Sequence, residues 1–580
     1  MRTNNLKKDS KRKEFDKILL FLQICVTLFC TILIIYLFCN QIIDVRHYKE
    51  KGRRQRSMTN YIMRGSIVDR NGIKLANDKG TYTIYIHPGD YKNNPDKPQK
   101  MAEMISPVVN IPINQVKEKI NSAVKKQSIV LLKRGVDREV VKKMRELHIR
   151  EISYEPIKER IYPQGTMAAH VLGYYNPFAD IAAGVEQTAQ EKLEYIENNF
   201  HAEKKLSGGV IYDFMTDPEL TTGPLIGQTV TLTLDSAIQH VCETELHKII
   251  QERSALRGAI IVMNPKTGEI LGYAVYPYYN PNEFRKATQL QLKNWSLTDV
   301  YPPGSTFKVL TVASALELGK INENTKVEDT GKIKFDKWEI KNHDVHKHPY
   351  PGWINLEYLF EHSSNVGSIK IAQKMTSEEF YGMLKNFGIG EKTGIDLPGE
   401  SKGILRNYKE WDRATHYAMG YGYGASVTPI QMVAAIGAIA NGGVKITPHV
   451  IKYTDEEAET KITKTRVMST ENAKKLTKIL AKSIENSSAP EKMDNYYIAA
   501  KTGTSQKPIE GRKGFTKNNL YTSIIGYLPA SDPQVLIYVV VDSAQGGAVW
   551  GATIAAPVFK EVAQQTARIM NIPPDKQKKE

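Results

Sequence analysis

The stretch Tyr301-Pro-Pro-Gly-Ser-Thr-Phe-Lys308 decides how this chain of 580 residues is interpreted. Its two prolines and Gly304 disfavour a helix up to that point, because proline lacks a backbone N–H and glycine is entropically costly in a helix. From Ser305 the sequence becomes apolar and helical, and Gly319 offers a C-terminal stop. The pattern therefore predicts a helix that begins at Ser305 and ends before Gly319.

Ser305 and Lys308 form a candidate nucleophile and base. Residues three apart share a helix face, so the lysine amine would lie next to the serine hydroxyl. Burial in an apolar helix and the positive end of the helix dipole would both lower the pKa of Lys308, which favours a neutral amine able to take the proton. Ser-x-x-Lys also occurs twice elsewhere, in a charged tail and in a lysine-rich stretch, so the pattern needs further motifs to support it.

A second motif, Ser363-Ser364-Asn365, is the only Ser-x-Asn in the chain and follows the helical stretch 356–362. A hydroxyl and an amide at this spacing suit proton relay and the orientation of a substrate carbonyl.

A third motif, Lys-Thr-Gly, occurs three times. Lys266-Thr267-Gly268 separates two apolar runs, which predicts a hairpin turn, and Lys392-Thr393-Gly394 lies in a Gly-rich loop. Lys501-Thr502-Gly503-Thr504 instead continues an apolar run, and two more strand candidates follow it, 521–527 and 535–541. A lysine and a hydroxyl on a strand edge, beside a glycine that allows close backbone approach, suit a substrate carboxylate. We therefore expect the third copy to be the functional one.

In this order the three motifs resemble those of the penicillin-binding proteins and serine β-lactamases. Three upstream segments resemble the opening motifs of the class B penicillin-binding proteins: Arg64–Ala76, Arg160–Gly165 with Gly173, and Gly184-Val-Glu186. Arg64 and Glu186 are expected to be structural rather than catalytic. The resemblance runs from about residue 60 to 565, which is nearly the whole chain.

The resemblance implies a peptidoglycan D,D-transpeptidase that works through an acyl-enzyme. Ser305 would attack the penultimate D-Ala carbonyl of a D-Ala-D-Ala stem peptide and expel the terminal D-Ala, and an amine of a neighbouring stem would then resolve the acyl-enzyme. Lys308 would be the general base, while Ser363 and Asn365 would relay the proton and hold the peptide. β-Lactams would acylate Ser305 as substrate mimics, and no metal or organic cofactor would be required.

The resemblance also assigns the strand motif to substrate binding. Lys501 and Thr502 would bind the terminal carboxylate beside Gly503, and the N–H groups of Ser305 and Thr504 would form the oxyanion hole. Because the resemblance gives the chain no glycosyltransferase domain, it implies a SEDS-type glycosyltransferase as a partner.

Other functions fit the sequence less well. A β-lactamase is disfavoured because the chain lacks Glu-x-x-Leu-Asn, and a penicillin sensor because only one candidate membrane span is visible. An inactive scaffold is disfavoured because all the expected catalytic side chains are present. A division or sporulation role is favoured, with an elongation-type transpeptidase as the alternative.

The resemblance and the residues together predict an α+β chain in five parts. Residues 18–39 carry no charge over 22 residues, which is long enough to cross a bilayer as an uncleaved anchor in the bacterial cell membrane. The catalytic part would lie on the extracytoplasmic side. The expected parts are a cytoplasmic tail 1–17, the transmembrane helix 18–39, a mixed α/β pedestal 45–225, a transpeptidase domain 226–568, and a C-terminal tail 569–580.

The transpeptidase domain is expected to hold an antiparallel sheet with helices on both faces, and the family resemblance adds a helical subdomain that carries Ser305 and Ser363. One of its helices can be predicted in detail, because Thr428 suits the N-cap, Pro429 the first helical position and Gln431 a capping box.

Several other features were considered and given no role. The net charge of +16 comes from scattered lysines without an aromatic-interleaved basic motif, so no nucleic-acid partner is expected. Residues 420–424, Gly-Tyr-Gly-Tyr-Gly, have the wrong glycine spacing for dinucleotide binding. His343, His346 and His348 are expected to form an exposed polar loop rather than a metal site. Cys242 is the only cysteine outside the anchor, which excludes an intrachain disulfide there.

Overall fold

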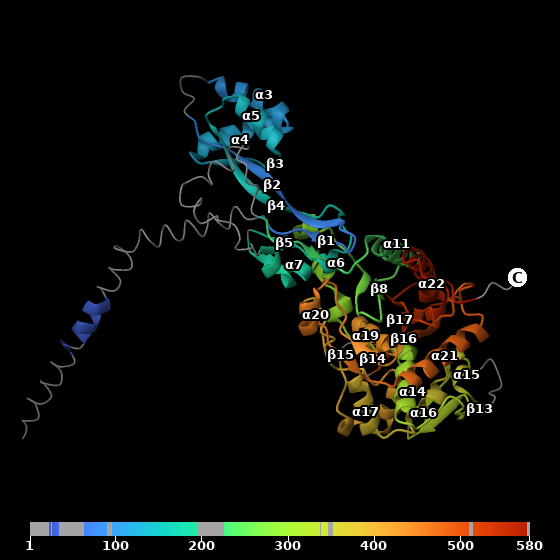
Figure 1. The fold of residues 1–580 in the computed structure, drawn as a ribbon. Helices are drawn as coiled ribbons and strands as arrows, with labels where there is room; N and C mark the ends of the chain where they lie inside the picture. The colour runs from blue at the N-terminus through green and yellow to red at the C-terminus, as the bar shows by residue number, and fades with distance from the viewer. Residues whose placement is uncertain are drawn as a thin grey trace, which may run out of the picture. The chain divides into compact units, whose positions relative to one another are not determined.

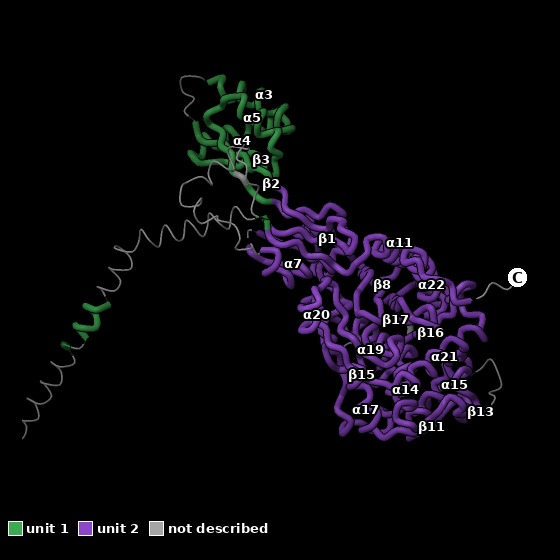
Figure 2. The backbone as a smooth tube through the Cα atoms, in the orientation of Figure 1, with its two compact units in different colours: residues 1–63, 80–158, 198–226 green, residues 64–79, 159–197, 227–580 purple. Residues whose placement is uncertain are grey.

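The computed structural model describes residues 23–24, 26–33, 63–89, 95–177, 179–194, 226–336, 338–345, 352–509 and 514–576. The predicted tail 1–17 and most of the predicted anchor 18–39 lie outside these residues, although 26–33 are helical. Within the described part of the chain, no helix combines the length and the apolar character needed to cross a membrane. The chain divides into two compact units, residues 1–63, 80–158 and 198–226, and residues 64–79, 159–197 and 227–580 (Figure 2).

The first unit is an α/β body. Its described elements are the part of β2 (Lys74–Ile86) from residue 80 on, β3 (Val130–Val136), most of β4 (Ile152–Ile161), α3 (Lys97–Val109), α4 (Ile113–Lys126) and α5 (Arg138–Glu146). Apolar side chains such as Ile84, Ile120 and Met144 are fully buried between them. The body combines helices and strands, which agrees with the mixed α/β composition expected for this part of the chain.

The second unit is built on a five-stranded antiparallel sheet in the order β16-β17-β18-β8-β9. The strands are β8 (Arg257–Met263), β9 (Ile270–Tyr276), β16 (Ala499–Pro508), β17 (Phe515–Leu528) and β18 (Val535–Asp542). Two of these strands precede the Ser305 region and three follow it, and β18 pairs with β8 to join them, with Ile537 opposite Val262. The predicted antiparallel sheet is confirmed.

Helices cover both faces of this sheet, as predicted. Alternate residues of β8 point in opposite directions: Ile260 and Val262 pack in one apolar cluster and Ile261 in another. Helices α11 (Ser236–Glu252) and α22 (Gly551–Ile569) contribute to the first cluster (Figure 1). Helix α19 (Pro429–Ala440), which contributes to the second, begins with the predicted capping box between Thr428 and Gln431.

A group of further helices lies on the α19 side of the sheet and shares its apolar cluster. These are α14 (Lys308–Glu317), α15 (Leu356–Glu361), α16 (Asn365–Ala372), α17 (Ser377–Asn386), α18 (Arg413–Gly420) and α21 (Thr470–Asn486). One boundary differs from the prediction, because the helix expected from Ser305 starts as the 3-10 turn η3 (Gly304–Phe307) and becomes α-helical only at Lys308. Hydrogen bonds that join the backbone around this turn to Gly422 and Ser505 override the local helical pattern.

The upstream motifs meet in a buried ion network within the second unit. Glu186, which is fully buried, accepts a hydrogen bond from Arg64 Nε at 2.7 Å and one from Arg160 Nε at 2.6 Å. Arg160 also pairs with Asp78 at 3.1 Å, and the Tyr162 hydroxyl donates to Glu186 at 3.2 Å. Removing one member of a buried ion pair typically costs about 3–5 kcal/mol, because the other charge is left buried without a partner. The network gives Arg64 and Glu186 the structural role that was expected.

Candidate active site

The turn that carries Ser305 is held by hydrogen bonds to two distant segments, one of which is β16. Gly304 N donates to Gly422 O at 3.1 Å, and the Ser505 hydroxyl, from β16, donates to Pro302 O at 2.6 Å. Because these contacts come from parts of the chain more than 100 residues away, the position of Ser305 depends on the assembled domain rather than on its own helix.

Two glycines make this close packing possible. A Cβ on Gly503 would lie 2.7 Å from Ser523 Oγ and 2.9 Å from Thr306 Cγ2, so a side chain there would force the strand and the turn apart. Gly422 has a φ of +90°, and a Cβ on it would lie 2.0 Å from Gly304 O. The glycine-rich segment 420–424 therefore supports the serine turn, and Gly503 allows the close backbone approach that the sequence suggested.

Lys308 is fully buried, and its side-chain nitrogen contacts the second motif. Nζ lies 2.8 Å from Asn365 Oδ1, 3.2 Å from Ser363 Oγ and 2.5 Å from the Ser363 carbonyl oxygen. Among the described residues no hydrogen bond joins Lys308 Nζ to Ser305 Oγ, because Nζ is turned toward these three acceptors. The structure therefore brings Lys308, Ser363 and Asn365 together, with Ser305 one turn before the lysine.

The surroundings of Lys308 favour a neutral amine. Burial, and then the positive charge of Lys501, hold the pKa of Lys308 well below its ordinary value, while Asp329 and Asp344 act in the opposite direction. The sequence predicted the direction of this change, although the second cause is a neighbouring lysine. A neutral lysine beside a serine is able to act as a general base near neutral pH.

A buried polar cluster supports the second motif, and the sequence analysis missed it. Asp329, fully buried, accepts hydrogen bonds from Ser364 Oγ at 2.5 Å and from Asn342 Nδ2 at 2.9 and 3.0 Å. Asn342 Oδ1 in turn accepts from the backbone N–H groups of Asn365 and Val366 at 2.8 and 3.1 Å. These bonds hold the start of α16, and so they fix the amide that faces Lys308.

The third motif occupies the β16 strand. Lys501 is only 4% exposed, and its Nζ donates to the Thr502 carbonyl at 3.2 Å and contacts the Thr502 hydroxyl at 3.4 Å. Burial lowers the pKa of Lys501 to about 8, and the negative charge of Glu491 opposes this shift. The Thr504 hydroxyl accepts a hydrogen bond from Gly551 N at 3.0 Å, at the start of α22. Lysine, hydroxyl and glycine thus share one strand beside the serine turn.

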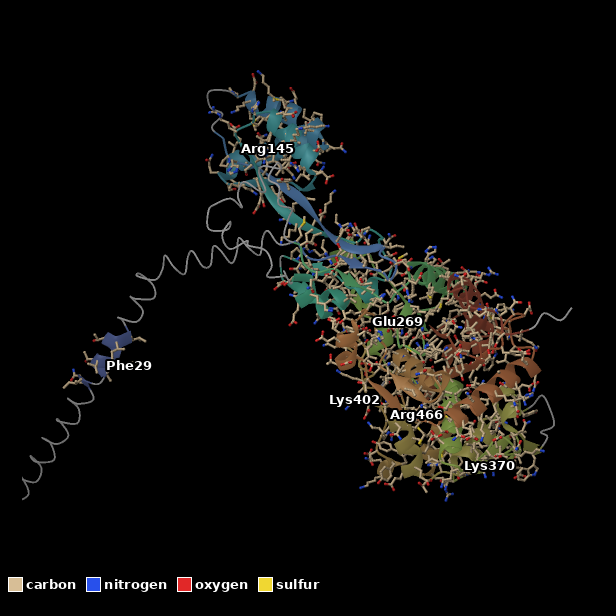
Figure 3. The ribbon with its side chains drawn as sticks, viewed as in Figure 1. Phe29, Arg145, Glu269, Lys370, Lys402 and Arg466 are labelled. Carbon is tan, nitrogen blue, oxygen red and sulfur yellow. The ribbon has the colours of Figure 1, made fainter. Side chains whose placement is uncertain are left out.

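The other two Lys-Thr-Gly copies lie where they were predicted, one in the turn of a hairpin and one in a loop. Lys266 lies in the hairpin between β8 and β9 and pairs with Asp532 at 2.6 Å. Figure 3 labels Glu269, which lies three residues further along this hairpin. In the copy at 392–394, the Thr393 hydroxyl donates to Glu400 at 2.6 Å. Neither copy lies on the strand that packs against the serine turn, whereas the copy at 501 does.

The remaining sequence features show no competing site. No group of three or more histidine, cysteine or acidic side chains in the described residues is arranged to hold a metal ion. His343 has its ring centre 6.5 Å from that of Trp550, and His346 and His348 lie outside the described residues. Lys402 and Arg466, labelled in Figure 3, are exposed basic side chains on different segments, which is typical of a solvated surface.

Two family models match the chain. The penicillin binding protein transpeptidase domain matches residues 258–564, and the penicillin-binding protein dimerisation domain matches residues 59–208. The first match alone covers more than half of the chain.

Curated relatives are similar over most of their length. Stage V sporulation protein D of Bacillus subtilis is 30% identical over 533 residues, which are 88% of this chain and 79% of that protein. A probable peptidoglycan D,D-transpeptidase, PenA of Neisseria gonorrhoeae, is 28% identical over 92% of this chain and 90% of its own. The peptidoglycan D,D-transpeptidase FtsI of Escherichia coli is 28% identical over 88% of this chain and 84% of its own.

Solved structures agree with these matches. A peptidoglycan synthetase from Bifidobacterium adolescentis is similar with a TM-score of 0.65 at 25% identity, over 90% of this chain and 98% of that one. The TP domain of penicillin-binding protein 3 from Burkholderia pseudomallei is similar with a TM-score of 0.53 at 31% identity, over 60% of this chain and 98% of that one.

Proposed function

The chain belongs to the class B penicillin-binding proteins, and from this premise we propose that it cross-links peptidoglycan as a D,D-transpeptidase with Ser305 as its nucleophile. One observation carries the assignment: the buried Lys308 amine meets Ser363 and Asn365, beside a serine turn that packs on the strand of Lys501. Three motifs far apart in the sequence thus converge on one site within a fold matched to this family.

In this proposal the first half of the reaction takes place on the α14 and α16 side of the site. Neutral Lys308 takes the proton of the Ser305 hydroxyl, whose oxygen attacks the penultimate D-Ala carbonyl of a D-Ala-D-Ala stem peptide. The proton then passes through Ser363 to the nitrogen of the departing D-Ala, while Asn365 orients the peptide. An amine of a second stem attacks the acyl-enzyme, transfers its proton back along this path and regenerates Ser305.

The β16 side holds the substrate and the developing charge. Lys501 and Thr502 bind the terminal carboxylate of the stem peptide through charge-assisted hydrogen bonds. The backbone N–H groups of Ser305 and Thr504 stabilise the oxyanion, a type of contact worth about 10²–10³ in rate. Gly503 allows the strand to lie close enough for this arrangement.

The same site explains reaction with β-lactams, whose strained amide and carboxylate imitate the end of the stem peptide. Full-length protein in membranes should form a one-to-one covalent adduct with labelled penicillin. Ser305→Ala should form none, whereas Ser314→Ala, which alters a buried serine two turns further along α14, should still be labelled. Peptide mapping that places the label on another residue would refute the assignment of Ser305.

Three finer points extend the proposal. Residues 18–39 anchor the chain once in the bacterial cell membrane, supported by an uncharged run of 22 residues, and place the catalytic domain outside the cytoplasm.

A SEDS-type glycosyltransferase supplies the glycan strands. The role is in division or sporulation, and the similarity to Stage V sporulation protein D supports the latter. Imaging a fluorescent fusion distinguishes a septal or forespore location from a sidewall location.

A further inference from the structure

A small polar cavity lies on the Lys501 side of β16. Its volume is about 230 Å³, and its lining includes Phe360, Ser483, Ser487, Glu491, Lys501 and Thr502. The cavity reaches a residue that neither the sequence motifs nor the proposed reaction uses. Glu491, in the segment between α21 and β16, is 3% exposed, and among the described residues its Oε2 has no hydrogen-bond partner.

A buried carboxylate oxygen without a partner is costly, so its position calls for a compensating positive charge. Burial raises the pKa of Glu491, and Lys501, which is also buried and lines the same cavity, is the charged side chain that lowers it. The neighbouring Lys492 is engaged elsewhere, with its Nζ at 3.6 Å from Glu485. Glu491 and Lys501 therefore share one cavity that is large enough for water, without a direct ion pair between them.

We propose that Glu491 is a positioning residue that keeps Lys501 protonated and directed for the carboxylate of the substrate. This inference rests on the proposed role of Lys501 in carboxylate binding. Glu491 contacts neither the nucleophile nor the general base, so it acts on the reaction only through Lys501.

The charges around Lys501 explain why such a residue is needed. Burial disfavours the charged form of the Lys501 amine. Glu491 is the carboxylate that acts against this effect, while Glu361 on α15 lines the same cavity at an intermediate exposure. Since the pKa of Lys501 is about 8, small changes in its surroundings alter its charge at physiological pH.

Removing the charge of Glu491 should lower the pH at which carboxylate binding is lost. Carboxylate binding requires charged Lys501 and is lost as pH rises through the pKa of that group. Without the charge of Glu491, that pKa falls further, and the alkaline loss of binding begins at lower pH. A nearby opposite charge typically changes a pKa by about one unit or more. A fall of about one unit would leave about fivefold less charged lysine at pH 8.

The test measures the acylation rate of the full-length protein with a carboxylate-bearing penicillin between pH 6 and 9. At each pH it determines the maximal rate and, separately, the half-saturation, which is the penicillin concentration that gives half of that rate. Glu491→Gln should move the alkaline rise in half-saturation to lower pH by about one unit, while the maximal rate stays within about twofold. Glu491→Asp, which keeps the charge but withdraws it by one methylene, should move it less. It provides the same test if the amide variant does not fold.

A matched control and a second background make the outcomes distinct. Glu485→Gln removes a carboxylate from the end of α21 that is paired with Lys492 and Lys576, and it should leave the pH profile unchanged. In a Lys501→Arg background, whose guanidinium stays charged, Glu491→Gln should no longer move the profile. Unchanged half-saturation in both Glu491 variants, or a loss confined to the maximal rate, would overturn the inference. If Lys501→Ala itself binds penicillin normally, the proposed function of Lys501 fails instead.

Discussion

Asn365 accepts a hydrogen bond from Lys308 at 2.8 Å although 57 residues separate them in the chain. Lys308 begins α14 and Asn365 begins α16, so two helix starts bring the amine and the amide together. This arrangement satisfies the amine by neutral acceptors rather than by a carboxylate. It therefore leaves Lys308 free of a direct ion pair that would favour its charged form.

Replacing Lys308 and replacing Lys501 should affect acylation in different ways. Lys308→Ala should abolish acylation even at saturating penicillin, because no base remains for the Ser305 hydroxyl. Lys501→Ala should instead weaken recognition of carboxylate-bearing ligands by about 1.5–3 kcal/mol, the range for a hydrogen bond to a charged group. Acylation rates over a range of penicillin concentrations separate the two effects.

The other Lys-Thr-Gly copies provide the controls. Lys266→Ala and Lys392→Ala should leave acylation nearly unchanged, because neither residue lies on the strand that packs against the serine turn. Equal losses for Lys392→Ala and Lys501→Ala would show that the strand copy was chosen wrongly.

Asp329 offers a test of the cluster beneath the second motif. Asp329→Asn removes a charge that raises the pKa of Lys308, so that pKa should fall further. Because the reaction needs the neutral amine, the rise of acylation with pH should begin at lower pH. The variant should also lose about 1–3 kcal/mol of folding stability, since buried partners are left imperfectly paired.

The exposed Asp336, on the strand hairpin that follows Asp329, is the matched control. Asp336→Asn should leave both the pH profile and the thermal midpoint unchanged. If folded Asp329→Asn protein has the same pH profile as the native protein, the charge of Asp329 does not influence the pKa of Lys308.

Gly503 tests whether the strand must approach the serine turn. Gly503→Ala places a methyl group 2.7 Å from Ser523 Oγ and 2.9 Å from Thr306 Cγ2, so β16 and the turn must move apart. We expect slower acylation at saturation, because the oxyanion contacts lengthen. Gly382→Ala, at a helical glycine with open space around it, should keep full acylation and gain about 0.5–1 kcal/mol of stability. Equal acylation rates for the two variants would contradict the requirement.

The sequence predicted those parts of the site that local patterns determine. Proline, glycine and the capping residues around Thr428 indicate where helices start, and continuous apolar runs indicate the strands, so the second and third motifs were assigned to the elements that carry them. Asp329 and Glu491 have no local signature. Asp329 acquires its role through Ser364, 35 residues away, and Glu491 through burial beside Lys501. Contacts of this kind depend on the assembled fold, which a single sequence does not specify residue by residue.

The 3-10 turn at Ser305 illustrates the same limit. The local pattern predicts a regular helix, yet Gly422 and Ser505 hold the turn by hydrogen bonds to Gly304 and Pro302. The 3-10 turn changes the backbone conformation at Ser305, but it does not change the choice of Ser305 as the candidate nucleophile.

The last prediction concerns the proposed membrane span and its partner. Polar side chains at Gln23, Thr27 and Thr31 recur every four residues on one helix face. The Thr27 hydroxyl donates to the Gln23 carbonyl and the Thr31 hydroxyl to the Thr27 carbonyl, both at 2.7 Å, so the two threonines are satisfied within their own helix. The Gln23 amide is then the group best suited to a hydrogen bond with a neighbouring helix, worth about 0.6 kcal/mol in a membrane.

Replacing residues 18–39 with an unrelated span should preserve penicillin binding in membranes while reducing co-purification with the glycosyltransferase. Gln23→Leu alone should reproduce part of that loss. The double variant Thr27→Val/Thr31→Val should not, because its hydroxyls bond to their own helix. If the protein with the replaced span co-purifies with the proposed glycosyltransferase and supports growth as well as the native one, residues 18–39 act only as an anchor, and any contact with that partner lies elsewhere in the chain.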